Sequence, residues 1–150
     1  LTPKSLLRHR TVISPVKIFT EGTFMEVVDD NNVSAKDVKR VVLCTGKVYY
    51  DLLEVQQKKK LKEVAIVRTE QLHPFPEKQL GAVLKKYKGA KVIWMQEEPA
   101  NMGYWSYIQR VMPKQDIELV SRKASASPAT GYSKVHKAEQ DKIVGQALGI

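Results

Sequence analysis

The apolar pattern that follows Arg40 constrains the fold more than any other feature of this sequence. Short runs rich in Val and Ile alternate there with longer segments whose apolar residues recur every three or four positions. This alternation is typical of strands and helices laid against a mostly parallel sheet. We therefore predict an α/β domain with strands at residues 41–44, 64–67, 91–95 and 117–120.

The segments between these runs predict helices. Apolar positions at helical spacing begin at Tyr49 and end at the lysine run 58–60, while Pro76 suits the first turn of a helix that Gly89 stops. Two further helices are predicted over residues 104–112 and 133–148, the second with Ser133 as its N-cap.

The first 39 residues are less regular. Ser14 and Pro15 suit the N-cap and first residue of a short helix that ends near residue 20, and residues 23–28 favour an edge strand. We expect this irregular segment, residues 1–39, to belong to the same domain as an α/β core over residues 40–150.

Composition limits the classes of protein to which the chain can belong. With 150 residues, 43% of them hydrophobic, one domain is expected. The longest apolar runs have about four residues whereas a bilayer span needs roughly 20, so we predict no membrane segment. The single cysteine, Cys44, lies inside an apolar run and favours an intracellular reducing compartment. The first residue is not Met, and we expect the chain to be cut from a longer polypeptide.

The net charge of +9 allows nucleic acid, an anionic ligand or an acidic neighbouring domain as a partner. The densest basic run, residues 58–60 with Lys62, has no interleaved aromatic residues and follows a predicted helix. A solvated helix end is therefore favoured over a nucleic-acid site.

Ligands of open α/β sheets bind beyond the carboxyl ends of the parallel strands. Thr45, Gly46 and Lys47 follow the first predicted strand and place a flexible backbone and a cation at a helix N-terminus, which favours a phosphate or carboxylate. Arg122 and Lys123 follow the last predicted strand. These five residues are our candidates for a regulatory anion site. They do not form a P-loop, because Val41 stands where that motif requires glycine.

No catalytic set is predicted. Glu97 and Glu98 are adjacent, so on a strand they would face opposite sides, and ion pairing is favoured over acid/base catalysis. The three histidines lie in different segments without the spacing of a metal site. Ser125 and Ser127 lack the flanking glycines of a nucleophile elbow and fit a loop of small residues.

Several stretches together resemble one family. These are residues 1–9, 45–52, 68–76, 96–101 and 122–131, followed by Val135 and His136. In this order they closely resemble the C-terminal end of the decarboxylating component of 2-oxoglutarate dehydrogenase. The chain departs from the usual pattern at Met102 and Tyr104, where the family more often has Gln and Ala.

This resemblance implies a transketolase C-terminal-like fold, a mixed sheet of about five strands with one antiparallel strand. It implies a whole enzyme that uses thiamine diphosphate and magnesium to decarboxylate 2-oxoglutarate and passes the succinyl group to a lipoyl-bearing succinyltransferase. The implied setting is the bacterial cytoplasm or the mitochondrial matrix. We expect neither cofactor to bind this chain, because it has no Gly-Asp-Gly stretch followed by an Asn pair that could hold magnesium diphosphate.

Three functions remain open from sequence. The first is a structural domain that packs in a homodimer and against the remaining domains of the same polypeptide. The second is a regulatory module for an acyl-CoA such as acetyl-CoA. The third, supported only by the charge, is a free-standing nucleic-acid-binding protein, which steeply salt-dependent binding to duplex DNA would reveal.

Overall fold

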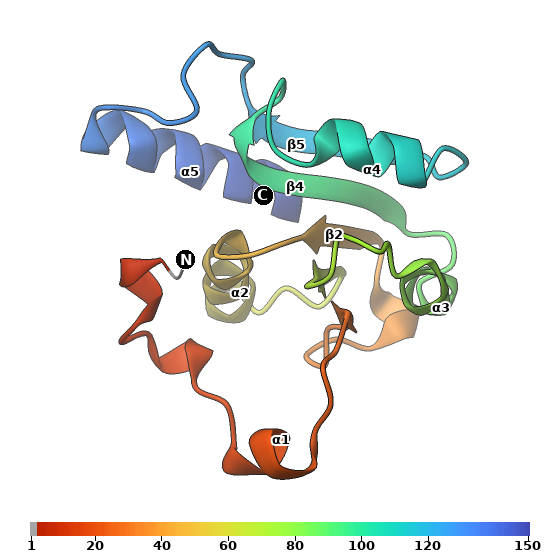
Figure 1. Ribbon diagram of the computed structural model, residues 1–150. Coiled ribbons are helices and arrows are strands. Elements are labelled where there is room, and N and C mark those ends of the chain that lie inside the picture. The colour runs from red at the N-terminus through yellow and green to blue at the C-terminus, as the bar shows by residue number, and fades with distance from the viewer. Residues whose placement is uncertain (1–2) are drawn as a thin grey trace.

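Five strands form one sheet, in the order β1-β3-β2-β4-β5, in the computed structural model, which describes residues 3–150. Strands β2 to β5 are parallel, and β1 pairs with β3 in the antiparallel sense at the edge (Figure 1). The strands are β1 Val27–Val28, β2 Arg40–Cys44, β3 Val64–Thr69, β4 Lys91–Pro99 and β5 Ile117–Arg122. The predicted α/β class and the one antiparallel strand are confirmed.

Helices cover both faces of the sheet (Figure 1). Their bounds are α1 Val16–Glu21, α2 Val48–Lys59, α3 Glu77–Lys86, α4 Trp105–Val111 and α5 Ser133–Leu148, with single 3₁₀ turns at Lys4–Leu6, Arg10–Val12 and Ala35–Asp37. No helix in the described part of the chain is both long and apolar enough to span a bilayer.

The sheet divides the buried side chains into two cores because successive residues of a strand point to opposite faces. Val42, Ile66 and Ile93 face α2 and α5, whereas Val41, Val67 and Trp94 face α3 and α4. The parallel strands are buried on both faces, which explains why they stand out in the sequence as continuous apolar runs. The predicted inward face of the last helix is also confirmed: Ile143, Val144, Ala147 and Leu148 are all buried.

The end of α5 is tied to the first core strand. The Arg40 guanidinium donates to the carbonyl oxygens of Gln146 and Ala147, at 3.2 and 3.3 Å. These carbonyls lie in the last turn of the helix, where i+4 donors run out; the Gln146 carbonyl also accepts from the Gly149 amide at 3.3 Å. Gly149 follows in the left-handed conformation, with φ +76°.

Some predicted boundaries were wrong. The predicted edge strand at 23–28 contains only two strand residues, because Thr23, Phe24 and Met25 are exposed and lie off the sheet. Tyr132, not Ser133, is the N-cap of α5, and Pro15, not Ser14, is the N-cap of α1. The 58–60 lysine run does end α2, and its three side chains are exposed.

Strand β4 continues four residues beyond its predicted end. Gln96, Glu97 and Glu98 follow the predicted strand 91–95, but they lie within β4. The pairing of β4 with β5 shifts register between Met95 and Pro99, so a bulge accommodates the polar stretch. This extension carries Glu97 to the carboxyl edge of the sheet, beside α2 and α5.

Candidate functional site: a polar network at the carboxyl edge of the sheet

Lys47 lies between two carboxylates at the start of α2. Its Nζ is 3.0 Å from Asp51 Oδ2, one helical turn away, and 2.8 Å from Glu97 Oε1 at the end of β4. Lys47 and Asp51 are four positions apart, the spacing at which two side chains are neighbours on a helix face. Two acidic partners balance the Lys47 charge within the chain.

Gln140 on α5 connects the ends of β4 and β5. Its Nε2 donates to Asp51 Oδ2 and to Glu97 Oε1, both at 2.9 Å. Its Oε1 accepts from Arg122 Nη2 at 2.9 Å. One amide therefore links α2, β4, β5 and α5 across the edge where α/β domains usually bind ligands.

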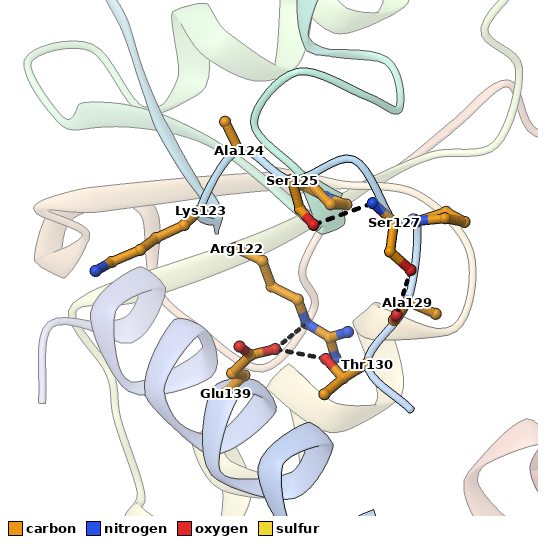
Figure 2. A pocket seen from close by; sticks show the side chains of 10 residues that line it. Arg122, Lys123, Ala124, Ser125, Ser127, Ala129, Thr130 and Glu139 are labelled. Atoms are coloured by element: carbon orange, nitrogen blue, oxygen red, sulfur yellow. Dashed lines mark hydrogen bonds and ion pairs between the residues drawn. The ribbon is translucent and has the colours of Figure 1, made fainter. Parts of the chain in front are cut away.

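Arg122 is the buried cation of this network, with 8% of its surface exposed. Its Nη2 lies 3.1 Å from His136 Nδ1, and its Nε lies 3.6 Å from Glu139 Oε2. Nε has no hydrogen-bond partner within the described residues. Figure 2 shows the guanidinium reaching toward Glu139 and Thr130, where the Thr130 hydroxyl donates to Glu139 Oε2 at 2.7 Å.

The charge state of Lys47 follows from these contacts. Burial alone would lower the pKa of the Lys47 ammonium, but hydrogen bonds from Lys47 to Glu97 and Asp51 outweigh burial and raise the pKa above its ordinary value. Lys47 is therefore charged at neutral pH, and its two carboxylate neighbours hold it in place.

A pocket of about 320 Å³ opens beside Arg122 (Figure 2). The loop after β5 forms its wall, including Lys123, Ser125 and Ser127, with Glu139 on the side of α5. Lys123 is exposed, and Figure 2 shows its side chain extending away from the Arg122 guanidinium. The pocket thus has one buried cation, one exposed cation and one carboxylate in its lining.

The structure divides the five sequence candidates into two groups. Arg122 and Lys123 line the pocket, whereas Thr45, Gly46 and Lys47 lie at the turn into α2. Gly46 has φ +71°, a conformation that favours glycine, so this turn requires the residue. Gln140 connects the groups, and sequence reasoning missed it because a lone Gln in an amphipathic helix carries no signal of its own.

A second polar cluster lies at the end of β3. The Arg68 guanidinium stacks 4.4 Å from the centre of the Tyr49 ring and donates to the Tyr50 hydroxyl at 3.1 Å. Its Nε lies 3.1 Å from Glu70 Oε1. Arg68 follows the predicted strand 64–67, and no pattern in the sequence joins Arg68 or Glu70 to the two tyrosines. These contacts bind α2 to β3.

The other sequence candidates have structural partners. Glu97 is ion-paired, as favoured from the sequence, while Glu98 is exposed. Ser127 Oγ donates to the Ala129 carbonyl at 2.8 Å, and the Ser125 backbone is held by Asn101. No group of three or more His, Cys, Asp or Glu side chains suited to a metal occurs among residues 3–150.

Cys44 is the small buried residue that its apolar context predicted. It is fully buried at the end of β2, and burial raises the pKa of its thiol far above the ordinary range. A thiol that stays protonated is a poor nucleophile and a poor metal ligand. Cys44 therefore belongs to the core rather than to the site.

A sequence model described as 2-oxoglutarate dehydrogenase C-terminal matches residues 13–148, nearly the whole of the described fold. The chain belongs to this family. The resemblance noted from the sequence is confirmed, and the three-layer arrangement with its mixed five-stranded sheet agrees with the transketolase C-terminal-like fold that the resemblance implied.

Relatives of known name agree with the family. The chain is 44% identical to an oxoglutarate dehydrogenase of Buchnera aphidicola subsp. Baizongia pistaciae, over 100% of this chain and 17% of the relative. It is 42% identical to a 2-oxoglutarate dehydrogenase E1 component of Azotobacter vinelandii (100% of this chain, 17% of the relative) and 40% identical to one of Cupriavidus necator (99% and 16%). This member of the family thus spans about a sixth of the length of these relatives.

Proposed function

We propose that this chain is the C-terminal structural and dimer-forming part of a 2-oxoglutarate dehydrogenase E1 component. The whole enzyme would decarboxylate 2-oxoglutarate and transfer the succinyl group to the lipoyl-bearing succinyltransferase of a multienzyme complex. It would act in the bacterial cytoplasm or the mitochondrial matrix. The family match and the named relatives support the enzyme assignment.

One observation supports a structural rather than a catalytic role. The carboxyl edge of the sheet is filled by the internal network of Lys47, Glu97, Gln140 and Arg122. Side chains that contact one another in this way fix the relative positions of helices and strands. The domain is thus suited to act as a rigid body within a larger enzyme.

The cofactors of the proposed enzyme do not fit the residues of this chain. Magnesium bound to a diphosphate needs several oxygen ligands, and residues 3–150 contain no metal-binding cluster. The one buried carboxylate, Asp30, already accepts from Gln56, from the Ile66 amide and from the Asn32 amide. We therefore propose that thiamine diphosphate and magnesium bind to the remainder of the polypeptide.

Calorimetric titration with thiamine diphosphate and magnesium tests this division. We expect the full-length protein to bind the cofactor and to decarboxylate 2-oxoglutarate, and the 150-residue chain to do neither, because it offers no metal ligand set. Binding by the isolated chain in the micromolar range, about −8 kcal/mol, would contradict the proposal.

The dimer role needs its own control. Sedimentation of the full-length protein should show a dimer, and a polypeptide truncated before residue 1 should lose it. A truncated protein that remains dimeric would leave the domain without the proposed role.

A second candidate function is an acyl-CoA-regulated anion site, favoured by the pocket into which Arg122 faces. An anion there would meet the buried Arg122 guanidinium, and the exposed Lys123 side chain would add a second cation by turning toward the pocket; charge-assisted hydrogen bonds are the strong ones. Lys47 would not contribute, because Asp51 and Glu97 already neutralise it.

This predicts different effects for two lysine substitutions. In the full-length protein, Lys123→Ala should weaken acetyl-CoA binding severalfold, while Lys47→Ala leaves it unchanged, as measured by calorimetry. Absence of acetyl-CoA binding to the parent protein, or equal affinity in the parent and Lys123→Ala, would eliminate this site.

A further inference from the structure

The segment from residue 13 to residue 25 is exposed along its whole length. It carries six large apolar side chains that are 45–78% exposed: Ile13, Val16, Ile18, Phe19, Phe24 and Met25. Figure 1 shows this part of the chain running away from the sheet to α1 and returning to β1. Scattered apolar side chains are common on protein surfaces, but six within 13 consecutive residues form a patch that marks an interaction surface.

Helix α1, in the middle of this segment, is not held by the rest of the domain. It has six residues, none of them buried, and no side chain caps its N-terminus. Isolated helices shorter than about 12 residues are marginal in water, and most helical stability in proteins comes from packing. A helix of this length whose apolar side chains are all exposed needs a surface to pack against.

Backbone contacts give the same picture. The hydrogen bonds of α1 and its flanks are local, such as Ile18 N to Pro15 O and Gly22 N to Ile18 O. The chain first joins the sheet at Glu26, whose carbonyl oxygen accepts from the amides of Glu70 and Gln71. The segment is therefore a loop whose backbone joins the sheet at its C-terminal end, at Glu26.

A surface that packs against α1 would have to be apolar. The only ion pair of the helix is internal, between Lys17 Nζ and Glu21 Oε2 at 3.4 Å, so α1 presents no net charge to a partner. Val16 and Phe19, three positions apart, share one face and are 76% and 78% exposed. A groove lined by apolar side chains is the surface that this face fits.

The exposed apolar side chains of a second copy offer a poorer match to this face. Outside the first 25 residues, the large exposed apolar side chains are Tyr104, Tyr132, Val135 and Ile150, which are spread over separate parts of the described chain. None of these four side chains belongs to an exposed apolar run like that of residues 13–25.

The remainder of the polypeptide is the partner within reach. The relatives contain about six times the length of this chain, and the family is a C-terminal one. Ten residues of chain span at most about 35 Å, so whatever precedes residue 3 is held close to the segment. Tethering of this kind raises the effective concentration of one surface near the other.

We propose that residues 13–25 form an anchor that docks, through Val16, Phe19 and Phe24, into an apolar groove on the polypeptide that precedes this domain. This inference rests on the proposed function only in taking the chain as the C-terminal part of a longer enzyme. The anchor fixes the α/β body against the rest of its own subunit.

Site-specific photo-crosslinking in the full-length protein tests the anchor. The photoreactive amino acid p-benzoylphenylalanine replaces Phe19, and in a matched control it replaces Tyr132, which is 79% exposed. Light and heavy isotope-labelled subunits are mixed before irradiation, so that mass spectrometry separates crosslinks within a subunit from crosslinks between subunits.

We expect the probe at position 19 to crosslink to residues that precede this chain in the same subunit, and the probe at 132 not to reach them. Crosslinks to a second subunit, or the same products from both probes, would overturn the proposal. Decarboxylation of 2-oxoglutarate by the unmodified parent is measured separately. An inactive parent with position-19 crosslinks within the subunit would refute the proposed function and leave the anchor intact.

A pair of substitutions gives an independent measurement. Phe19→Asp should make the segment at least tenfold more sensitive to limited proteolysis in the full-length protein, because a charge cannot enter the apolar groove. Val135→Asp, on the exposed side of α5, should leave the cleavage rate unchanged. Equal cleavage of parent and Phe19→Asp would count against docking.

Discussion

Replacing Gln96 with leucine is expected to lower the free energy of unfolding by about 3–5 kcal/mol, since each buried polar group left without a partner costs about 1–3 kcal/mol. Gln96 is 3% exposed. Its Oε1 accepts from the Trp94 indole at 3.0 Å and from the Trp105 amide at 3.1 Å, and its Nε2 donates to the carbonyl oxygens of Met102 and Pro99 at 2.7 and 3.1 Å. Leucine has a similar volume and makes none of these bonds.

The measurement is equilibrium unfolding in urea, with Gln109→Leu as the matched control. Gln109 is exposed on α4, so its substitution should change stability by less than about 0.5 kcal/mol. Gly103 lies in the loop that Gln96 contacts. It has φ +68°, and a Cβ added there would lie 2.9 Å from Gln96 Nε2, so this loop packs closely against the Gln96 side chain. If the free energy of unfolding of Gln96→Leu lies within 1 kcal/mol of that of the parent, the role assigned to Gln96 is wrong.

The second large effect is expected at Asp30, which is 5% exposed just after β1. Its Oδ2 accepts from Gln56 Nε2 at 2.7 Å and from the Ile66 amide at 2.9 Å, and its Oδ1 accepts from the Asn32 amide at 2.7 Å. Asp30→Ala leaves three donors without their acceptor. Hydrogen bonds to charged groups contribute about 1.5–3 kcal/mol each, so a loss of about 3–4 kcal/mol is expected after partial rearrangement.

Thermal and urea unfolding of Asp30→Ala, beside Asp37→Ala at an exposed position, provide the measurement. Hydrogen exchange locates the effect: the Ile66 amide in the centre of β3 should lose protection, because its acceptor is a side chain rather than a neighbouring strand. Unchanged protection of Ile66 in Asp30→Ala would contradict this explanation.

Gln96 also shows where sequence reasoning stops. The parallel strands could be predicted because burial on both faces produces unbroken apolar runs, as in residues 41–44. The same logic ended β4 at Met95, since the next three side chains are polar. A buried glutamine that satisfies its hydrogen bonds from a neighbouring loop is indistinguishable, in one sequence, from a solvated one.

The candidate site also contains residues that the sequence predicted and residues that it did not. The rule that strand ends carry ligand-binding groups selected Lys47 and Arg122, which the structure links through Gln140. Gln140 lies 43 positions from Glu97 and 89 from Asp51, and no local pattern reports such contacts. Pairing between residues far apart in the chain depends on how the helices pack, which a periodic pattern does not encode. Residues 13–25 were predicted as a short helix followed by an edge strand; the helix is present as α1, but no pattern in the sequence predicted that the whole segment would be exposed.

The bond from Arg40 to the end of α5 has a consequence for synthesis. The first core strand is complete after 44 residues, but the carbonyls that Arg40 binds belong to residues 146 and 147. One of the two cores also takes Ile143, Val144, Ala147 and Leu148 from this last helix. A ribosome adds roughly 5–20 residues each second, so several seconds pass between the completion of β2 and that of α5, and during this time α2 is the only helix of residues 3–150 that can cover this face of the sheet. We therefore expect a chain truncated before Ile143 to lose four side chains of one core and the acceptors of Arg40 together.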